Sequence, residues 1–389
     1  MQNQEPPNNM SMNFDRDEFL RYSRHFALPQ IGLDGQAKLK AASVLVIGAG
    51  GLGNPVTTYL AAAGIGHLGI VDFDVVNLSN LQRQVLFTTA DIGRAKSETA
   101  RQRLQALNPY VEITTYNEPL LSSNAEKIAT NYDLVIDGTD NFPTRYLVND
   151  ICVFLGKPNV YGSIYQFSGQ VSLFHAAEGP CYRCLFPEPP PAGLVPSCAE
   201  GGVLGVLPGI VGSLQATEAV KWIAGIGDSL MGRLLLIDAL TMEFHQVKLR
   251  KNPNCPVCGD QPTITTPIDY EYFCGLSGTE EQVKAPQLTA NDVKAKLDAG
   301  ENIVLLDVRE EWEWQIAHLD QALFIPLHNL PDKLDELDPS QEIVVYCHTG
   351  KRSAEVATFL VNEGFTRVSD MTGGIRAWAM EVDPALMQY

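Results

Sequence analysis

The sequence lacks an apolar run suited to a membrane span, and it lacks an excess of basic residues. The uncharged stretch 201–217 falls short of the roughly 18 apolar residues that a spanning helix needs, and it contains several glycines and Pro208. The formal net charge is −18 at pH 7, so the field of the chain repels polyphosphate surfaces. We expect no membrane and no nucleic-acid partner, and any phosphate site must be assembled locally.

The sequence also lacks the marks of a secreted protein. Residues 1–12 are rich in Gln, Asn and Pro and show no basic start followed by an apolar segment, so we expect a flexible tail and no secretory signal. The chain has eight cysteines, and the C-x-x-C spacing of two pairs is not that of a secreted disulfide scaffold. A reducing, cytoplasmic location is therefore expected.

Composition and hydrophobic periodicity predict more than one α/β domain. Hydrophobic residues make up 45% of the 389 residues and charged residues 19%, which is typical of a soluble protein with more than one core. In the first part, short apolar runs alternate with helical patterns, which predicts a mostly parallel, Rossmann-like sheet. The predicted strands are residues 43–48, 67–72 and 132–137, and the predicted helices are residues 54–63 and 96–107.

A second, shorter α/β pattern follows a segment rich in Gly, Ser, Thr and charged residues. Its predicted strands are residues 302–308 and 342–346, and its predicted helices are residues 290–299 and 353–362. About a hundred residues suffice for a small domain. The expected organisation is a tail over residues 1–12, a first domain over 13–275, a linker over 276–286 and a small α/β domain over 287–389.

A glycine-rich motif follows the first predicted strand. Residues 48–53 read Gly-Ala-Gly-Gly-Leu-Gly, which fits G-x-G-x-x-G, and missing side chains let phosphate approach backbone amides at a helix N-terminus. Asp72 ends the next strand, where an acidic side chain usually accepts the ribose hydroxyls. Taken alone, this unit also fits dinucleotide binding, so an NAD-dependent oxidoreductase is an alternative.

The residues that follow Asp72 suit a nucleoside triphosphate better than a nicotinamide. Residues 72–84 read Asp-Phe-Asp-Val-Val-Asn-Leu-Ser-Asn-Leu-Gln-Arg-Gln, and Lys96 follows. Attack of a carboxylate on an α-phosphate brings two anions together, and cations with a metal ion offset that repulsion. Arg83, Lys96 and Asp140 can fill those roles. On spacing alone, Arg83 and Lys96 could equally belong to solvated helix faces.

Three segments together resemble the MoeB/ThiF family of adenylating enzymes, which are relatives of the ubiquitin-activating enzymes. They are the loop 48–53, the segment 72–84 and residues 137–142, which read Asp-Gly-Thr-Asp-Asn-Phe, and the resemblance covers nearly all of residues 21–275. It implies an adenylation domain that binds ATP, with Mg²⁺ on Asp140 and with Arg83 and Asp140 in catalytic roles. The nucleotide-binding residues that it implies are Gly51, Asp72, Ser79, Asn80, Leu81, Gln82, Arg83, Lys96, Asp140, Asn141 and Arg24.

The same resemblance implies a subunit arrangement and a substrate. Arg24 matches a family position that reaches ATP from the neighbouring subunit, which implies a homodimer. The implied reaction is adenylation of the C-terminal glycine of a small ubiquitin-fold sulfur-carrier protein that ends in Gly-Gly. The small subunit of molybdopterin synthase is the favoured carrier, and a carrier of the thiamine pathway is an alternative. A platform that only binds ubiquitin-fold proteins, without catalysis, is an alternative of another class.

Two C-x-x-C pairs, Cys181 with Cys184 and Cys255 with Cys258, predict a zinc site. Four thiolates close a tetrahedral shell and leave no position for water or substrate, so the Zn²⁺ would be structural. The long separation between the pairs leaves redox disulfides as an alternative on spacing alone. Enzymes that resemble this chain hold a structural zinc at these positions.

The scattered cysteines lie in different settings. Cys198 follows a proline-rich stretch and precedes a glycine-rich helix start that could stabilise a thiolate. A solitary cysteine is more often an inert small hydrophobic residue, but the family position implies a reactive thiol. Cys152 lies in an apolar helical stretch and Cys274 lies beside Phe273, so both are expected to pack in the core.

Cys347 opens a strand-loop-helix segment in the second domain. Residues 347–353 read Cys-His-Thr-Gly-Lys-Arg-Ser, and such a nest of amides around one sulfur stabilises a persulfide anion. Lys351, Arg352 and the helix dipole are expected to favour the thiolate. A phosphatase-like loop is the alternative, but such loops are usually longer by a residue or more.

The surrounding segments resemble single-domain rhodaneses. They are residues 306–313, 317–319 before Ile325 and Pro326, and 372–378; the turn 317–322 departs from the usual Gly-His-Ile pattern. This resemblance implies a sulfur donor such as a cysteine desulfurase or thiosulfate. The expected sequence of steps is adenylation, attack of a Cys347 persulfide on the acyl carbon, and cleavage of the acyl disulfide by Cys198 to give a thiocarboxylate.

Overall fold

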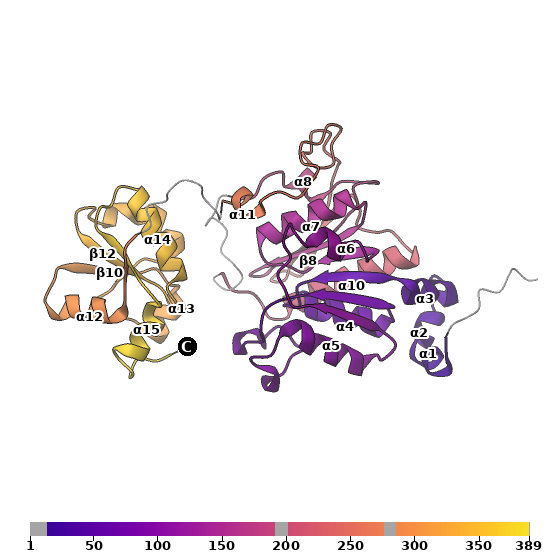
Figure 1. The fold of residues 1–389 in the computed structure, drawn as a ribbon, viewed down its shortest axis with the longest axis horizontal. Helices are drawn as coiled ribbons and strands as arrows, with labels where there is room; N and C mark the ends of the chain where they lie inside the picture. Colours follow the sequence, from indigo (N-terminus) through magenta and orange to yellow (C-terminus); the bar gives the residue numbers. More distant parts are fainter. Residues whose placement is uncertain (1–13, 191–200, 276–284, 389) are drawn as a thin grey trace, which may run out of the picture. The chain divides into compact units, whose positions relative to one another are not determined.

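The computed structural model describes residues 14–190, 201–275 and 285–388. The chain divides into two compact units, residues 1–277 and 278–389, which Figure 1 draws in colours that follow the sequence. In the described part of the chain, none of the helices combines the length and apolarity that a membrane span requires.

The first unit is built on an eight-stranded sheet with strand order β3-β2-β1-β4-β5-β6-β7-β8. Its first five strands run parallel and the last three form an antiparallel extension. The strands are β1 (Ser43–Ile47), β2 (His67–Val71), β3 (Glu112–Tyr116), β4 (Leu134–Asp137), β5 (Asn159–Tyr165), β6 (Ser168–Phe174), β7 (Arg233–Asp238) and β8 (Glu243–Lys248). The mostly parallel α/β sheet expected from the sequence is confirmed.

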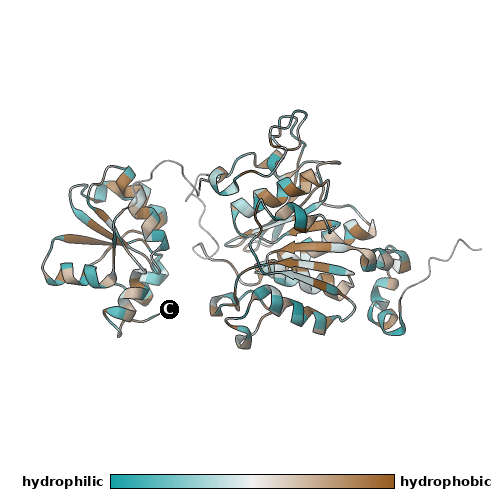
Figure 2. Cartoon of the chain, in the orientation of Figure 1, coloured by the Kyte–Doolittle hydropathy of each residue, from teal (hydrophilic) through white to brown (hydrophobic). Residues whose placement is uncertain are grey.

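Helices cover both faces of this sheet, because its central strands are apolar on both sides. In β1, Val44 and Val46 pack toward α4, α5 and α10, whereas Leu45 and Ile47 pack toward α6 and α7. Figure 2 shows the central strands as mostly hydrophobic ribbons between these helices. The helices are α1 (Arg16–Arg21), α2 (Ser23–Phe26), α3 (Gly32–Ala41), α4 (Gly53–Ala63), α5 (Lys96–Leu107), α6 (Ala125–Ala129), α7 (Phe142–Phe154), α8 (Tyr182–Leu185), α10 (Leu207–Ala224) and α11 (Tyr270–Phe273), with short 3₁₀ turns η1 (Leu78–Asn80) and η2 (Thr89–Asp91).

The second unit is a five-stranded parallel sheet with strand order β11-β10-β12-β13-β9. Its central strand β12 buries Ile343 and Val345 on one face and Val344 and Tyr346 on the other. The strands are β9 (Gln287–Leu288), β10 (Ile303–Asp307), β11 (Leu323–Phe324), β12 (Glu342–Tyr346) and β13 (Val368–Met371). The helices are α12 (Ala290–Asp298), α13 (Glu311–Ile316), α14 (Lys351–Asn362) and α15 (Gly374–Glu381), with the 3₁₀ segment η3 (Leu327–Glu336).

The elements predicted from periodicity are confirmed to within two residues at each end. The predicted helix 96–107 coincides with α5, and the predicted strand 342–346 coincides with β12. Cys152 and Cys274 lie in the hydrophobic core beside α7, where packing was expected for them. Strong hydrophobic periodicity therefore located the elements without tertiary information.

A fully buried ion pair fastens α8 to α7 in the first unit. The guanidinium of Arg183 donates to both carboxylate oxygens of Asp150, at 2.8 and 2.9 Å, and neither side chain is exposed. The rings of Tyr146 and Phe273 lie 4.6 and 4.4 Å from the guanidinium carbon. The hydroxyl of Tyr270 donates to Asp150 at 3.0 Å. The charge of Arg183 is thus compensated by one carboxylate in an otherwise apolar setting.

We predict that Asp150→Asn destabilises the first unit by about 3–5 kcal/mol, because the buried guanidinium of Arg183 loses its counter-charge. The measurement is the urea midpoint of unfolding, followed by tryptophan fluorescence and circular dichroism. Glu98→Gln is the matched control, since Glu98 pairs with Arg101 on the surface of α5. Equal midpoints for the two variants would show that the buried ion pair contributes no more to the free energy of unfolding than the exposed pair does.

Candidate functional site

The first candidate site lies where the order of the parallel strands reverses. Strand β1 pairs with β2 on one side and with β4 on the other, and the crossover helices leave in opposite directions from this point. The amide of Gly48 donates to Val71 at 2.8 Å, and the amide of Gly138 donates to Ile47 at 2.9 Å. The residues just after β1, β2 and β4 therefore lie side by side. Ligands of open parallel sheets bind in the crevice at this edge.

The glycine loop needs its glycines for steric reasons. Gly48 has a φ of +92°, and a Cβ there would lie 2.9 Å from the carbonyl oxygen of Gly138. A Cβ at Gly53 would overlap the carbonyl oxygen of Gly48. A Cβ at Gly51 would only touch Pro208, at 3.3 Å. The loop is thus closed tightly against the start of α4, with backbone amides at a helix N-terminus that suit phosphate.

Asp72 lies directly after β2 and supports this loop. One carboxylate oxygen accepts the amide of Ala49 at 2.7 Å, and the other accepts the amide of Asp74 at 2.9 Å. Burial raises the pKa of Asp72 above its usual value, and the nearby charge of Lys96 acts in the opposite direction. Each oxygen keeps a lone pair that can accept a ribose hydroxyl.

Lys96 begins α5 and points back to this edge. Its Nζ lies 2.8 Å from the carboxylate of Asp74, while the lysine side chain is 6% exposed and the aspartate side chain is 56% exposed. Nearby, Gln84 is buried, and among the described residues its Oε1 has no hydrogen-bond partner. A buried cation and an unsatisfied buried amide next to a glycine loop fit an anionic, hydrogen-bonding ligand.

The segment between Asn77 and Gln84 holds its own side chains in place. Asn80 is buried and accepts the amide of Asn77 at 3.1 Å, and Arg83 donates to the carbonyl of Ser79 at 3.0 Å. Leu81 packs against the core, whereas Ser79 and Gln82 are exposed. The turn thereby fixes the guanidinium of Arg83 near the glycine loop, since Arg83 Cδ lies 3.8 Å from a Cβ built on Gly51.

Asp140 and Asn141 lie after β4, at the same edge of the sheet. Asn141 caps α7 by accepting the amide of Thr144 at 3.0 Å. Asp140 is exposed, and no hydrogen bond or ion pair from another described residue engages its carboxylate. Behind them, buried Asp137 lies 3.6 Å from the guanidinium of Arg145. The exposed carboxylate of Asp140 is chemically suited to Mg²⁺, which prefers oxygen ligands.

Two sequence-predicted residues are not joined to this cluster. Arg24 is exposed on α2, and within the described ranges it makes no hydrogen bond or ion pair with the glycine loop or Asp140. Cys198 lies outside the described residues.

The four cysteines of the two C-x-x-C pairs come together although 74 residues separate Cys181 from Cys255. Their sulfur atoms all lie within 4.8 Å of one another, and three of the sulfur–sulfur distances are 3.4, 3.5 and 3.9 Å. Zn–S bonds of about 2.3 Å imply sulfur separations of about 3.8 Å, whereas a disulfide needs about 2.05 Å. The four side chains therefore fit a tetrahedral metal ion and do not form disulfides.

In the second unit, Cys347 follows the central strand β12 and is buried. The amide of Gly350 donates to its sulfur at 3.2 Å, and the hydroxyl of Ser353 donates to it at 3.5 Å. Gly350 has a φ of +92° at the start of α14. A Cβ at Gly374 would overlap the carbonyl oxygen of Cys347, so α15 closes on the loop from the other side.

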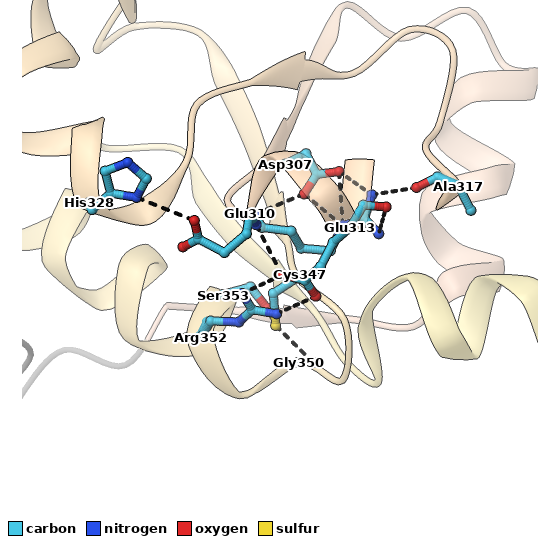
Figure 3. A network of polar contacts seen from close by, with 10 residues as sticks. Asp307, Glu310, Glu313, Ala317, His328, Cys347, Gly350, Arg352 and Ser353 are labelled. Carbon is cyan, nitrogen blue, oxygen red and sulfur yellow. Dashed lines mark hydrogen bonds and ion pairs between the residues drawn. The ribbon is translucent and has the colours of Figure 1, made fainter. Parts of the chain in front are cut away.

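Arg352, which we expected from the sequence to favour the thiolate of Cys347, is paired with a carboxylate. Its guanidinium donates twice to the carboxylate of Glu313, at 2.7 Å each. Figure 3 shows this pair together with Asp307, the last residue of β10. The guanidinium of Arg309 donates to the carboxylate of Asp307. Lys351 is exposed. No sequence pattern indicated this network, because Glu313 is 39 residues away from Arg352.

Sequence reasoning also missed Asp74, Gln84 and Arg145. Gln84 and Asp74 belong to the segment that was recognised, but no pattern shows that one is buried without a partner and the other holds Lys96. Arg145 is a charged residue that is buried together with apolar residues of α7. Sequence reasoning did not assign it a role.

Known proteins match both units. A model described as "ThiF family" matches residues 22–257, and one described as "Rhodanese-like domain" matches residues 289–381. The chain is 48% identical to "Probable adenylyltransferase/sulfurtransferase MoeZ" of Mycobacterium tuberculosis, over 96% of each chain. It is 58% identical to "Sulfur carrier protein adenylyltransferase" of Thermus thermophilus, over 68% of this chain and all of that protein. It is 44% identical to "Adenylyltransferase and sulfurtransferase MOCS3" of Sus scrofa, over 96% of this chain and 88% of that protein.

A solved structure shares the fold of the first unit. The crystal structure of E. coli MccB with ATP matches 64% of this chain and 83% of that chain, with a TM-score of 0.54 and 21% identity. At this identity the likeness concerns the fold alone.

We predict that Gly53→Ala weakens ATP binding by at least about tenfold, a change of about 1.4 kcal/mol, because the added Cβ forces the loop open. Isothermal titration gives the dissociation constant. Gly209→Ala, where a Cβ meets no atom within 4 Å, is the control and should bind as the original chain does. Unchanged ATP affinity in a folded Gly53→Ala protein would exclude the glycine loop as the phosphate site.

Proposed function

The chain belongs to the ThiF family and is an adenylyltransferase with sulfurtransferase activity, and we propose that its substrate is a small ubiquitin-fold sulfur-carrier protein. In this proposal the chain adenylates the carrier's C-terminal glycine and then converts it to a thiocarboxylate with sulfur from Cys347. The observation that carries the proposal is the presence in one chain of a glycine loop at the switch point of a parallel sheet and a buried cysteine whose sulfur accepts the amide of Gly350. The name of the Thermus thermophilus relative supports a sulfur carrier as the acceptor.

The first step is attack of the glycine carboxylate on the α-phosphate of ATP. A bond forms between the carboxylate oxygen and phosphorus, and pyrophosphate leaves with its bonding electron pair. The amides of the glycine loop hold the phosphates, while Asp72 accepts ribose hydroxyls. Arg83 and Lys96 supply positive charge where two anions meet. Asp140 would hold Mg²⁺, which neutralises phosphate charge when bound. Ser79, Asn80, Leu81, Gln82 and Asn141 would complete the nucleotide contacts.

The second step joins the two activities. A persulfide on Cys347 attacks the acyl carbon, AMP leaves, and an acyl disulfide links the carrier to Cys347. In the third step the Cys198 thiolate attacks Sγ of Cys347, which releases the thiocarboxylate and leaves a disulfide between the two cysteines. A cellular thiol reductant then restores both thiols.

The remaining parts of the proposal concern assembly and biological setting. Arg24 would reach ATP in the neighbouring subunit of a homodimer, and its exposure on α2 supports this role. The favoured carrier is the small subunit of molybdopterin synthase, in the cytoplasm, with a thiamine-pathway carrier as the second choice. The sulfur donor would be a cysteine desulfurase or thiosulfate.

We also propose that Cys181, Cys184, Cys255 and Cys258 hold a structural Zn²⁺. The site joins the start of α8 to the loop after β8, and the shell leaves no open coordination position. The ion would then stabilise the fold without taking part in the reaction.

The reaction is tested with the full chain, ATP, Mg²⁺, a sulfur donor and candidate carriers that end in Gly-Gly. We expect pyrophosphate release that depends on the carrier, and a carrier mass that rises by the exchange of one oxygen for sulfur. Cys347→Ser should keep pyrophosphate release and lose thiocarboxylate, while Lys96→Met should lose both. The proposal fails if the chain binds NADH in place of ATP, or if no tested carrier is adenylated.

The metal proposal predicts one zinc per chain by elemental analysis. Cys255→Ser should lose the metal and lower the melting temperature, because binding energy of the closed site is folding energy. Cys152→Ser is the matched control, since Cys152 is buried and lies outside the cluster. A metal-free protein that melts where the metal-loaded one does, or a disulfide between these cysteines under reducing conditions, would contradict a structural zinc.

A further inference from the structure

A mostly buried ion pair lies at the base of the sulfur loop. Arg352 in the first turn of α14 donates from Nη1 and Nη2 to the two oxygens of Glu313, at 2.7 Å each. The arginine side chain is 11% exposed and that of Glu313 is 4% exposed. A bidentate pair with so little solvent is strong and weakly screened. Glu313 therefore takes up both outer nitrogens of Arg352 and compensates its charge.

Glu313 is held in this position by its own surroundings. Its carboxylate accepts the amide of Glu310 at 3.0 Å, and its carbonyl accepts from Arg309 at 3.4 Å. Arg309 is itself paired with Asp307 at the end of β10. Burial opposes ionisation of Glu313, but the hydrogen bonds from Arg352 and the Glu310 amide prevail and hold its pKa below the usual value. The carboxylate is thus charged at neutral pH.

The ion pair of Arg352 and Glu313 is linked to the surroundings of the Cys347 sulfur through neighbouring residues. Ser353, the residue after Arg352, donates its hydroxyl to the sulfur of Cys347 at 3.5 Å. His348 follows Cys347, and its pKa lies below the usual value chiefly because the ring is partly buried. The charge of Glu313 raises this pKa, and the charge of Arg352 lowers it. Lys351 and Arg376 are also near the loop but are exposed, so solvent screens their charges. The fully buried Arg309 also acts on His348, but Asp307 compensates its charge. Arg352 is therefore the cation near the loop whose charge depends on Glu313.

Two chemical classes of donor differ in how much they need such a cation. With thiosulfate, the Cys347 thiolate attacks the outer sulfur, a new S–S bond forms, and sulfite leaves with the bonding electrons as a dianion. In this transition state the thiolate and thiosulfate together carry three negative charges. With a cysteine persulfide, the thiolate attacks the terminal sulfur and a cysteine thiolate leaves, so the reacting groups carry two negative charges. Compensating the charge of Arg352 therefore disfavours thiosulfate more than a persulfide.

We propose that Glu313 is a specificity-determining positioning residue, which withholds the charge of Arg352 from the sulfur loop and thereby selects singly charged persulfides over small dianionic donors. The proposal rests on the proposed role of Cys347 as sulfur acceptor and adds the donor class and the residue that sets it. Glu313 acts through Arg352 and does not itself touch the donor.

The test compares sulfur uptake by the full chain from thiosulfate, with cyanide as acceptor, and from cysteine persulfide. Glu313→Gln keeps an oxygen for the Glu310 amide and removes the charge. We expect its KM for thiosulfate to fall by about tenfold, as for a gain of one order in affinity. Uptake from cysteine persulfide should change by less than about threefold. Glu311→Gln, on the exposed side of the same helix, should behave as the original chain does.

Two further variants separate this role from a merely structural one. Arg352→Gln alone leaves the carboxylate of Glu313 without its counter-charge and should raise the thiosulfate KM by about tenfold, whereas Arg352→Gln added to Glu313→Gln removes both charges and should return the KM to within about twofold of the original. The proposal is overturned if Glu313→Gln and Glu311→Gln share one KM, if the gain survives loss of Arg352, or if Arg352→Gln alone lowers the KM. These assays use neither ATP nor carrier, and uptake that persists in Cys347→Ser would instead refute the proposed sulfur acceptor.

Discussion

An acidic chain that handles anions must fix its cations close to where they act, and the candidate sites of this protein are organised around that constraint. With a net charge of −18, long-range attraction cannot gather phosphate or persulfide groups. The structure holds Lys96 on Asp74 and Arg83 on the carbonyl of Ser79, and side chains ordered in advance lose little entropy when the ligand arrives. In the second unit, Glu313 instead pairs with Arg352 and compensates its charge.

The two units share one strand-loop-helix arrangement but place different chemical groups in the loop. In each, a buried parallel strand ends at a tight loop that leads into a helix, so backbone amides converge at the carboxyl edge of the sheet. In the first unit that loop is formed by glycines after β1, and a Cβ at Gly48 or Gly53 would collide with the backbone. In the second unit Cys347 takes the first position of the loop after β12, and the amide of Gly350 points at its sulfur. The candidate nucleotide site and the candidate sulfur site thus share one geometry and differ in their residues.

Local patterns predicted the scaffold, and they also identified most residues of the candidate sites. Strand β1, the glycine loop and helix α5 are visible in sequence because periodicity and steric requirements are local. What stayed hidden depends on contacts between distant segments. The pairing of Arg352 with Glu313 spans 39 residues, and no spacing rule connects them. The sequence therefore assigned Arg352 to the thiolate, whereas the structure assigns its guanidinium to a carboxylate.

The cysteines show the same division between local and distant information. The C-x-x-C spacing predicted a metal site, but only the fold brings Cys181 within 3.5 Å of Cys255. The burial of Asp150 with Arg183 was also beyond sequence reasoning, because a charged residue on a helix is usually read as exposed. Tertiary packing decides which polar residues are buried, and these buried polar residues hold the loops of both units in place.

The central claim is that the sulfur of the thiocarboxylate passes through Cys347 of the same enzyme that forms the adenylate. The most direct measurement is a single turnover with the chain loaded with isotopically labelled sulfur at Cys347 and then separated from the donor. After addition of ATP and an unlabelled carrier, the account predicts one labelled thiocarboxylate per loaded chain, only in the presence of ATP. Label that stays on Cys347 while adenylate accumulates, or that reaches the carrier without ATP, would contradict it.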